Sequence, residues 1–146
     1  MAASARSELR PQHSTGALLW QVSNRWQAVT RAALKPFGLT HVQFVLLASL
    51  HRLDAGVTQR DLAKFAGADP MMTSQVVRVL EAHGWVTRKP HASDRRAWVL
   101  RVTRPGATLA RRAGAAVSAS DELFFAALGR DGTAFRSALE ALRGQG

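Results

Sequence analysis

The fold class is decided by residues 69–103, which read DPMMTSQVVRVLEAHGWVTRKPHASDRRAWVLRVT. Asp69 is a good helix N-cap, and Pro70 suits the first helical position, where its missing N–H has no partner to lose. Gly84 suits the end of a helix, because glycine adopts a left-handed backbone at little cost. The pattern therefore predicts a helix over residues 70–83.

A β-hairpin is predicted directly behind this helix. Residues 85–89 and 97–103 have strand character, since apolar and polar side chains alternate along the second segment. Residues 90–94 between them are turn formers. A shorter helix, predicted over residues 59–65 and ended by Gly67, precedes the first one, and such a pair is typical of a helix-turn-helix. Because a basic hairpin follows the pair, the order of elements predicts a winged helix.

Longer helices are predicted on both sides of this unit. Apolar residues recur at helical spacing over residues 13–35, and the segment 41–53 is apolar nearly all round, so it should be buried on several sides. Further helices are predicted over residues 105–128 and 132–143. The fold class is thus mainly α with a small β-hairpin wing. The predicted organisation is a disordered lead-in over residues 1–12, an N-terminal helix over 13–38, a winged helix-turn-helix domain over 39–104 and C-terminal helices over 105–146.

The composition favours a polyanionic partner. The formal net charge is +10, and residues 55–104 are the most basic part, with nine Lys or Arg and four acidic residues. A solvated basic surface and a membrane-surface helix are alternatives, although the basic run lacks helical spacing. The absence of cysteine excludes disulfides and thiol chemistry and is compatible with a reducing cytosol. No apolar run approaches the roughly 20 residues that span a bilayer, and the first residues lack the apolar core of a signal peptide.

The outward face of the predicted 70–83 helix carries side chains suited to reading DNA bases. Gln75 can pair with adenine, Arg78 with guanine, and Ser74 with donors or acceptors. Thr73, Ser74 and Gln75 lie near the helix start, where a recognition helix usually touches bases. An ordinary polar face is the alternative, and the adjoining basic hairpin favours DNA reading. The side chains predicted to face the core are Leu62, Ala63 and Phe65 of the shorter helix and Met72, Val76, Val79, Leu80 and His83 of this one.

The hairpin tip and the elements beside it offer cations for the sugar-phosphate backbone and the minor groove. Arg95 and Arg96 suit a minor groove because a guanidinium is flat and cationic. Asp94 can orient an arginine through a paired hydrogen bond, a solvent-exposed ion pair being the alternative. Phosphate contacts, which set register and salt dependence, are predicted for Thr58, Arg60, Lys64, Arg88 and Lys89.

Together these residues resemble the MarR family of bacterial and archaeal transcriptional regulators. The resemblance is carried by Thr73, Val76, Leu80-Glu81, Gly84-Trp85-Val86-Thr87-Arg88, Asp94-Arg95-Arg96, Val102-Thr103 and Gly106. One departure is Trp85, which stands where the family usually has a smaller aliphatic residue.

The resemblance implies a homodimer whose terminal helices, within residues 13–38 and 105–146, interleave. Each recognition helix would enter a major groove and Arg96 the adjacent minor groove, while Asp94 orients the wing and Arg95 reaches the backbone or the groove edge. A two-fold dimer needs a pseudo-palindromic operator with half-sites roughly 10 bp apart. Repression is the commoner mode among similar proteins.

The resemblance also implies a small aromatic or phenolic effector, bound where the dimerisation helices meet the winged domain. Trp20 and Asn24 share the polar side of the first helix and can cradle an aromatic acid. Phe44 and His51 of the second helix can face the same space. The alternatives are that Trp20 packs against the partner chain and that Phe44 and His51 are ordinary core side chains.

No enzyme, cofactor or metal site is predicted. The five histidines show no close pair at metal-ligand spacing, although a site between two chains is left open. The chain has neither a glycine-rich phosphate loop nor a nucleophile elbow. Two other functions stay open. One is a protein-interaction adaptor, which needs no cations on the recognition face, and the other is a packaging protein, which binds all DNA sequences equally.

Overall fold

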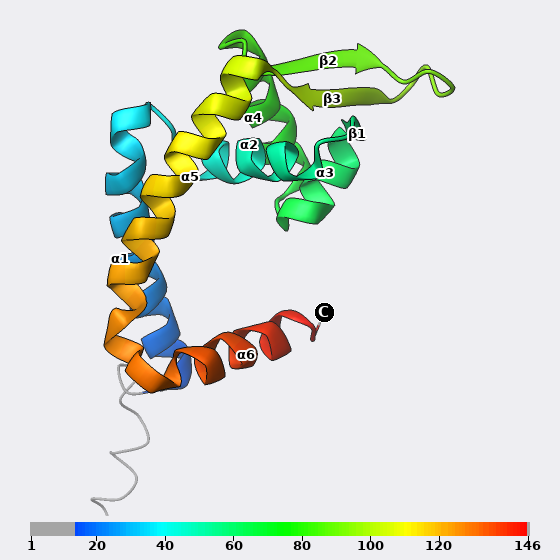
Figure 1. Cartoon of the computed structure of the whole chain (residues 1–146). Helices are drawn as coiled ribbons and strands as arrows, with labels where there is room; N and C mark the ends of the chain where they lie inside the picture. Colours follow the sequence, from blue (N-terminus) through cyan, green and yellow to red (C-terminus); the bar gives the residue numbers. More distant parts are fainter. Residues whose placement is uncertain (1–13, 146) are drawn as a thin grey trace, which may run out of the picture.

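The computed structural model describes residues 14–145 and confirms a mainly helical fold with a small sheet (Figure 1). The winged domain contains α2 (His41–Leu53), β1 (Val57–Thr58), α3 (Gln59–Ala66), α4 (Pro70–Ala82), β2 (Val86–Pro90) and β3 (Trp98–Val102). The flanking elements are α1 (Thr15–Leu34), η2 (Lys35–Phe37), α5 (Arg104–Phe125), η3 (Ala126–Asp131) and α6 (Gly132–Arg143). The predicted lead-in over residues 1–12 lies outside the described residues.

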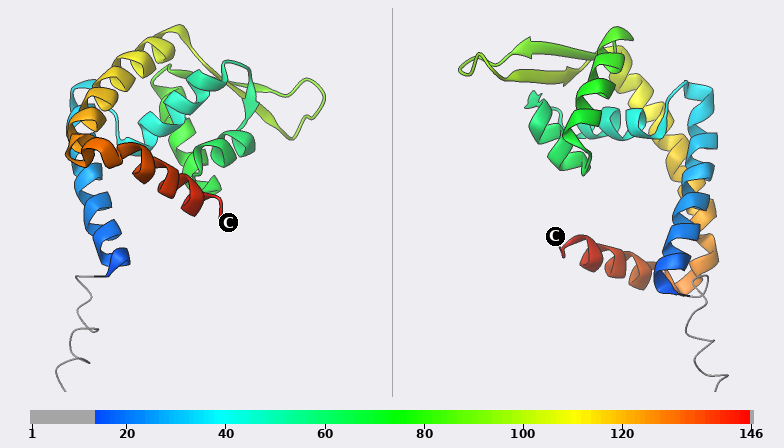
Figure 2. Two further views of the ribbon diagram at one scale, coloured as in Figure 1. Left: turned by 60° about the horizontal axis from the view of Figure 1, so that its bottom comes forward. Right: turned by 180° about the vertical axis from the view of Figure 1, so that it is seen from behind.

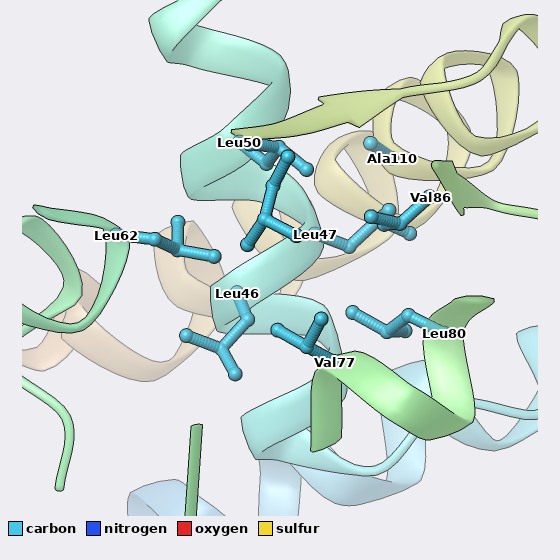
Figure 3. Close-up of a cluster of buried hydrophobic side chains, with 9 residues drawn as sticks. Leu46, Leu47, Leu50, Leu62, Val77, Leu80, Val86 and Ala110 are labelled. Atoms are coloured by element: carbon cyan, nitrogen blue, oxygen red, sulfur yellow. The ribbon is translucent and has the colours of Figure 1, made fainter. Parts of the chain in front are cut away.

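The core of the winged domain is centred on α2, as the all-round apolar character of that segment predicts. Thr40 and Gln43 form a capping box that fixes where the helix begins. Its buried leucines pack against α3, α4, the sheet and α5 (Figure 3). The buried cluster consists of Leu46, Leu47, Leu50, Leu62, Val77, Leu80, Val86, Leu100 and Ala110. Val77 and Leu80 of α4 belong to this cluster, so the side of α4 that is buried is the side that packs against α2.

The wing is a three-stranded antiparallel sheet in the order β1-β3-β2. Strands β2 and β3 pair from Val86 opposite Val102 to Pro90 opposite Trp98, which confirms the predicted hairpin. The third strand, β1, was not predicted, because two residues are too few to show an alternating pattern. It pairs with β3 and leads directly into α3, so it joins the start of α3 to the base of the wing.

The joint between α4 and the wing is held by Thr103. Its Oγ1 donates to the carbonyl of Gly84 at 2.7 Å and accepts from the N–H of Gly106 at 3.1 Å, which caps α5. Its N–H donates to the carbonyl of Trp85 at 3.0 Å. Gly106 is buried, and a Cβ there would overlap the Trp85 carbonyl, so only glycine allows this close approach.

Helices α1 and α5 lie antiparallel against each other, beside the winged domain (Figures 1 and 2). The indole N–H of Trp26 donates to Asp121 across this contact at 2.8 Å, and His41 packs edge-on against the same indole. Burial lowers the pKa of His41, and the nearby positive charge of Arg31 lowers it further, so this imidazole is neutral at pH 7. A second buried cluster, Leu34, Leu39, Ala113 and Val117, closes the corner between α1, α2 and α5.

The buried side of α4 differs from the predicted one. Val77 and Thr73 are fully buried, as is Leu80, which was predicted correctly. Adjacent apolar pairs at positions 76–77 and 79–80 make two overlapping faces equally apolar, so hydrophobic pattern alone does not choose between them. The residues predicted to face the core that are exposed instead are Met72, Val79 and His83.

Helix α3 also turns one predicted core residue outward. Phe65 is 50% exposed, and the guanidinium of Arg52 lies 5.9 Å from its ring centroid. Leu62 and Ala63 are buried as expected. The helix is thus anchored through Leu62 and Ala63, with Ala66 packed beside them, and Phe65 lies at the edge of the domain.

No single helix within residues 14–145 is long and apolar enough to cross a membrane. Residues 15–37 and 41–53 meet the length and composition requirement only as a pair, which is bent by 73°. The same described residues contain no group of three or more side chains that could hold a metal ion.

Candidate nucleic-acid interface

Helix α4 is positioned by its N-cap and by the core beneath it. The Asp69 carboxylate accepts from the Met72 N–H at 2.8 Å, which satisfies one of the free donors at the helix start. The opposite face of the helix points away from the core, with Gln75 and Arg78 exposed and Ser74 partly exposed. These are three of the four side chains that the sequence assigned to base recognition, the fourth being Thr73.

Thr73 is a correction to that assignment. Its side chain is fully buried, and its Oγ1 donates to the backbone carbonyl of Asp69 at 2.8 Å. A side chain with no exposed surface cannot contact DNA, so the prediction for Thr73 is wrong. The error arose from the choice of buried face: at 100° per residue Thr73 lies on the side of Val77 and Leu80, which packs against α2, and not on the side predicted to be outward.

Met71 is a candidate contact that the sequence reasoning missed. Its side chain is 76% exposed at the first turn of α4. It lies four residues before Gln75 and seven before Arg78, so the three side chains form one stripe along the helix. An apolar side chain at this place can contact the methyl group of thymine. The spacing alone could have identified it.

Helix α3 adds two cations beside α4. Arg60 and Lys64 are exposed and stand one turn apart on the same face. Thr58 is the N-cap of α3, and its Oγ1 accepts from the N–H of Asp61 at 3.1 Å. The hydroxyl hydrogen of Thr58 stays available as a donor, so all three predicted phosphate contacts are compatible with the structure.

Arg88 is engaged inside the wing. Its guanidinium lies 3.5 Å from the Glu81 carboxylate of α4 and 4.8 Å from the ring centroid of Trp98 on β3. The Arg88 side chain is 28% exposed, whereas the neighbouring Lys89 is exposed to solvent. We call Glu81, Arg88 and Trp98 the wing bracket, because they connect α4 to both long strands. Arg88 is therefore better placed to fix the wing than to bind a phosphate, whereas Lys89 is open to one.

The wing tip presents two unpaired arginines. The Asp94 carboxylate accepts from the backbone N–H of Arg96 at 3.0 Å, so it shapes the backbone and does not pair with a guanidinium. Arg95 and Arg96 are both exposed, and within residues 14–145 neither forms an ion pair. Within the described residues Asp94 thus makes neither the predicted paired hydrogen bond to an arginine side chain nor the alternative ion pair, and its orienting role on DNA stays a prediction.

Helices α3 and α4 and the wing carry seven exposed cations between them. The wing and α3 lie on the side of the winged domain away from α1 and α5 in all views (Figures 1 and 2). Two of the acidic groups there, Asp69 and Asp94, are occupied by backbone N–H donors. The exposed cations of α3, α4 and the wing are Arg60, Lys64, Arg78, Lys89, Arg95, Arg96 and Arg101.

Known proteins share this arrangement of sequence and fold. Residues 39–98 match the model of the MarR family. The HTH-type transcriptional regulator YdcH of Bacillus subtilis is 42% identical over 120 residues, which cover 80% of this chain and 82% of YdcH. The chain therefore belongs to the MarR family. Like the other members of the MarR family, it is a transcriptional regulator and not an enzyme.

Two solved structures extend the comparison for this MarR-family chain. The MarR family protein Rv2887 of Mycobacterium tuberculosis, in complex with salicylic acid, is 35% identical with a TM-score of 0.69, over 88% of this chain and 96% of that one. The transcriptional repressor CouR of Rhodococcus jostii, bound to a 23-mer DNA duplex, is 26% identical with a TM-score of 0.83, over 90% and 94% of the two chains.

The four effector residues suggested by the MarR resemblance do not form one site within this single chain. Trp20 is 70% exposed on α1, and Asn24 is exposed one turn later. Phe44 packs against the second buried cluster, which favours the core alternative, and His51 is partly buried farther along α2. An open cavity of about 470 Å³ lies between the end of α1 and the start of α2, and other residues line it: Arg31, Ala32, Lys35, Gly38, Leu39 and Thr40.

Proposed function

We propose that the chain is a sequence-specific repressor that binds double-stranded DNA as a homodimer in the cytoplasm. The observation that carries the proposal is the pairing of an outward α4 face, with Gln75 and Arg78, and a wing tip with two unpaired arginines. Side chains of the first kind read base edges in a major groove, and exposed arginines suit the narrow, negative minor groove. The repressor names of CouR and Rv2887 support the mode of action.

The flanking cations complete the proposed DNA contact. Arg60 and Lys64 on α3 and Lys89 on β2 would bind phosphates on either side of the grooves. Such contacts add affinity without sequence preference, and they make binding fall steeply as salt rises. Gln75, Arg78 and Met71 would then supply the preference for particular bases.

The homodimer is supported by apolar surface on the helices outside the winged domain. Leu18, Leu19 and Val22 of α1 are 42–52% exposed, and Leu123 near the end of α5 is 81% exposed. A cavity of about 510 Å³ lies there as well, lined by Val22, Leu123, Phe124, Phe125 and Phe135 among others. A soluble monomer rarely exposes so many large apolar side chains together. We assign this surface, within residues 13–38 and 105–146, to a second copy of the chain.

An effector of the aromatic acid class is a further part of the proposal. It is supported by the salicylic acid complex of Rv2887 and the p-coumaroyl-CoA complex of CouR. In this chain the corner cavity holds Arg31 and Lys35, which can pair with a carboxylate, beside apolar side chains. Trp20 and Asn24 stay candidates for contacts in the assembled dimer, where a second chain can cover them.

Selection of bound duplexes from a random pool tests the function. The purified full-length chain is mixed with the pool at moderate salt, and bound duplexes are amplified and sequenced. A pseudo-palindromic consensus with half-sites roughly 10 bp apart is the expected result. Retention of all sequences alike would indicate a packaging protein, and absence of retention would indicate an adaptor. Sedimentation of the free protein checks the dimer independently.

A further inference from the structure

The wing tip is organised around one imidazole. His91 Nδ1 lies 3.2 Å from the backbone nitrogen of Ser93 and 3.1 Å from that of Asp94, and both N–H groups point at it. The Ser93 hydroxyl is a third neighbour of the same atom, at 3.2 Å. An imidazole nitrogen accepts only when it carries no proton. His91 is therefore neutral in this arrangement, with its proton on Nε2.

Two successive hydrogen bonds connect His91 to Arg96. His91 fixes the N–H of Asp94, and the Asp94 carboxylate in turn accepts from the N–H of Arg96. Two backbone bonds close the loop: His91 N–H to the Ala97 carbonyl at 2.9 Å, and Ala97 N–H to the Asp94 carbonyl at 3.1 Å. No residue from 91 to 97 is buried, so these polar contacts set the shape of the loop.

We propose that His91 is the positioning residue of the wing and that its protonation releases the tip. A protonated Nδ1 is a donor, so it repels the two N–H groups that it now accepts from, and Asp94 and Arg96 lose their fixed places. DNA binding then weakens as the pH falls. The proposal rests on the proposed function, because it is the wing's contact with DNA that reports the effect.

The direction of the change in DNA affinity distinguishes release of the tip from the mere addition of a positive charge to it. The charged residues within five positions of His91 in the sequence are Arg88 and Lys89 on β2 and Asp94, Arg95 and Arg96 on the tip. Within the described residues, no hydrogen bond or ion pair joins the His91 ring to another element. An extra positive charge at this place would by itself strengthen binding to a polyanion. Release of the tip predicts the opposite, namely weaker binding in acid.

The experiment compares three variants by their affinity for the selected duplex at constant salt, between about pH 5.5 and pH 8, the range in which histidine changes charge. His91→Asn keeps an acceptor that can bind the same backbone N–H groups but does not titrate. His91→Ala removes the acceptor. His83→Asn is the matched control, since His83 is an exposed histidine at the end of α4.

The wild-type chain and His83→Asn should lose affinity by about tenfold from pH 8 to pH 5.5, the effect of two or so lost hydrogen bonds. His91→Asn should bind as the wild type does at pH 8 and lose most of the pH dependence, whereas His91→Ala should bind weakly throughout. The proposal is overturned if the wild type binds more tightly in acid, if His91→Asn keeps the wild-type profile, or if His91→Ala binds normally at pH 8.

A measurement on the free protein keeps the test independent of DNA. The backbone amide resonances of Ser93 and Asp94 should shift with pH in the wild type and stay in place in His91→Asn. If these resonances behave as expected and no duplex is bound at any pH, the proposed function fails while the positioning role of His91 stands. If they do not respond to pH in the wild type, the positioning role itself is wrong.

Discussion

The recognition helix and the wing tip present similar side chains by different physical means. Helix α4 is held by long-range packing, because Val77 and Leu80 are buried against α2 and the exposed face follows from that contact. The wing tip is held by short-range hydrogen bonds among residues 91–97. A substitution at the wing tip should therefore change the shape of the tip without unfolding the protein. Which face of α4 is exposed depends instead on packing throughout the core.

The largest expected effect lies at the joint between the two regions. Gly106→Ala places a methyl group on the Trp85 carbonyl, so the backbone must shift at the turn that connects α4 with the wing. We expect a loss of roughly 3 kcal/mol or more in the free energy of unfolding, measured by chemical denaturation. Gly114→Ala is the matched control in α5, where a Cβ meets nothing within 4 Å. It should stabilise the chain by about 0.5–1 kcal/mol, and equal effects of the two variants would refute the close approach.

The next largest effect concerns the wing tip. Arg96→Ala should weaken binding to the selected duplex by about 2–3 kcal/mol, because a charge-assisted contact is lost, while the melting temperature stays the same. Arg104→Ala removes the same charge from the exposed start of α5 and should have a much smaller effect. Titration of labelled duplex measures both. Wild-type affinity in Arg96→Ala would remove the wing from the mechanism.

On α4, base preference should change with little loss of stability. Gln75→Ala and Arg78→Ala should each lose about 1–3 kcal/mol of discrimination at one base pair, since one paired contact is removed. Thr73→Val is the contrasting variant. Thr73 is buried, so this change should lower stability by roughly 1 kcal/mol through its lost hydrogen bond and leave the preferred sequence unaltered. Competition with single-base variants of the duplex measures the preference, and a new preference in Thr73→Val would restore it as a contact.

The smallest effect is expected at the wing bracket. Trp98→Leu removes the ring under the Arg88 guanidinium and should weaken DNA binding by about 0.5–1 kcal/mol, because the strands are held less firmly against α4. Trp98→Phe keeps an aromatic ring, so its affinity for DNA should lie between those of the wild type and Trp98→Leu. The affinity for the selected duplex is the measurement, and an unchanged value in Trp98→Leu would show that Glu81 and Arg88 suffice.

The sequence predicted the wing better than the helix face, and the difference between the two regions explains why. Caps and turn formers, such as Asp69, Gly84 and the tip residues, act on their immediate neighbours. The boundaries of the elements, and the position of Asp94-Arg95-Arg96 at the tip of the hairpin, were therefore predictable. The burial of Thr73 depends on where α2 lies, and two adjacent apolar pairs in α4 allowed the wrong face. The pairing of β1 with β3, the engagement of Arg88 by Glu81 and Trp98, and the acceptor role of His91 all require coordinates, because each depends on a contact made through folding.

The central claim, that α4 and the wing tip contact neighbouring grooves of one duplex, can be tested directly because the chain has no cysteine. Single cysteines at Met72, beside the reading face, and at Ala92, on the tip, each carry a tethered iron chelate that cleaves nearby DNA. We expect the Met72→Cys probe to cleave within the major groove of each half-site and the Ala92→Cys probe to cleave in the adjacent minor groove. Cleavage by only one probe, or at positions on the duplex that are not adjacent, would contradict the account.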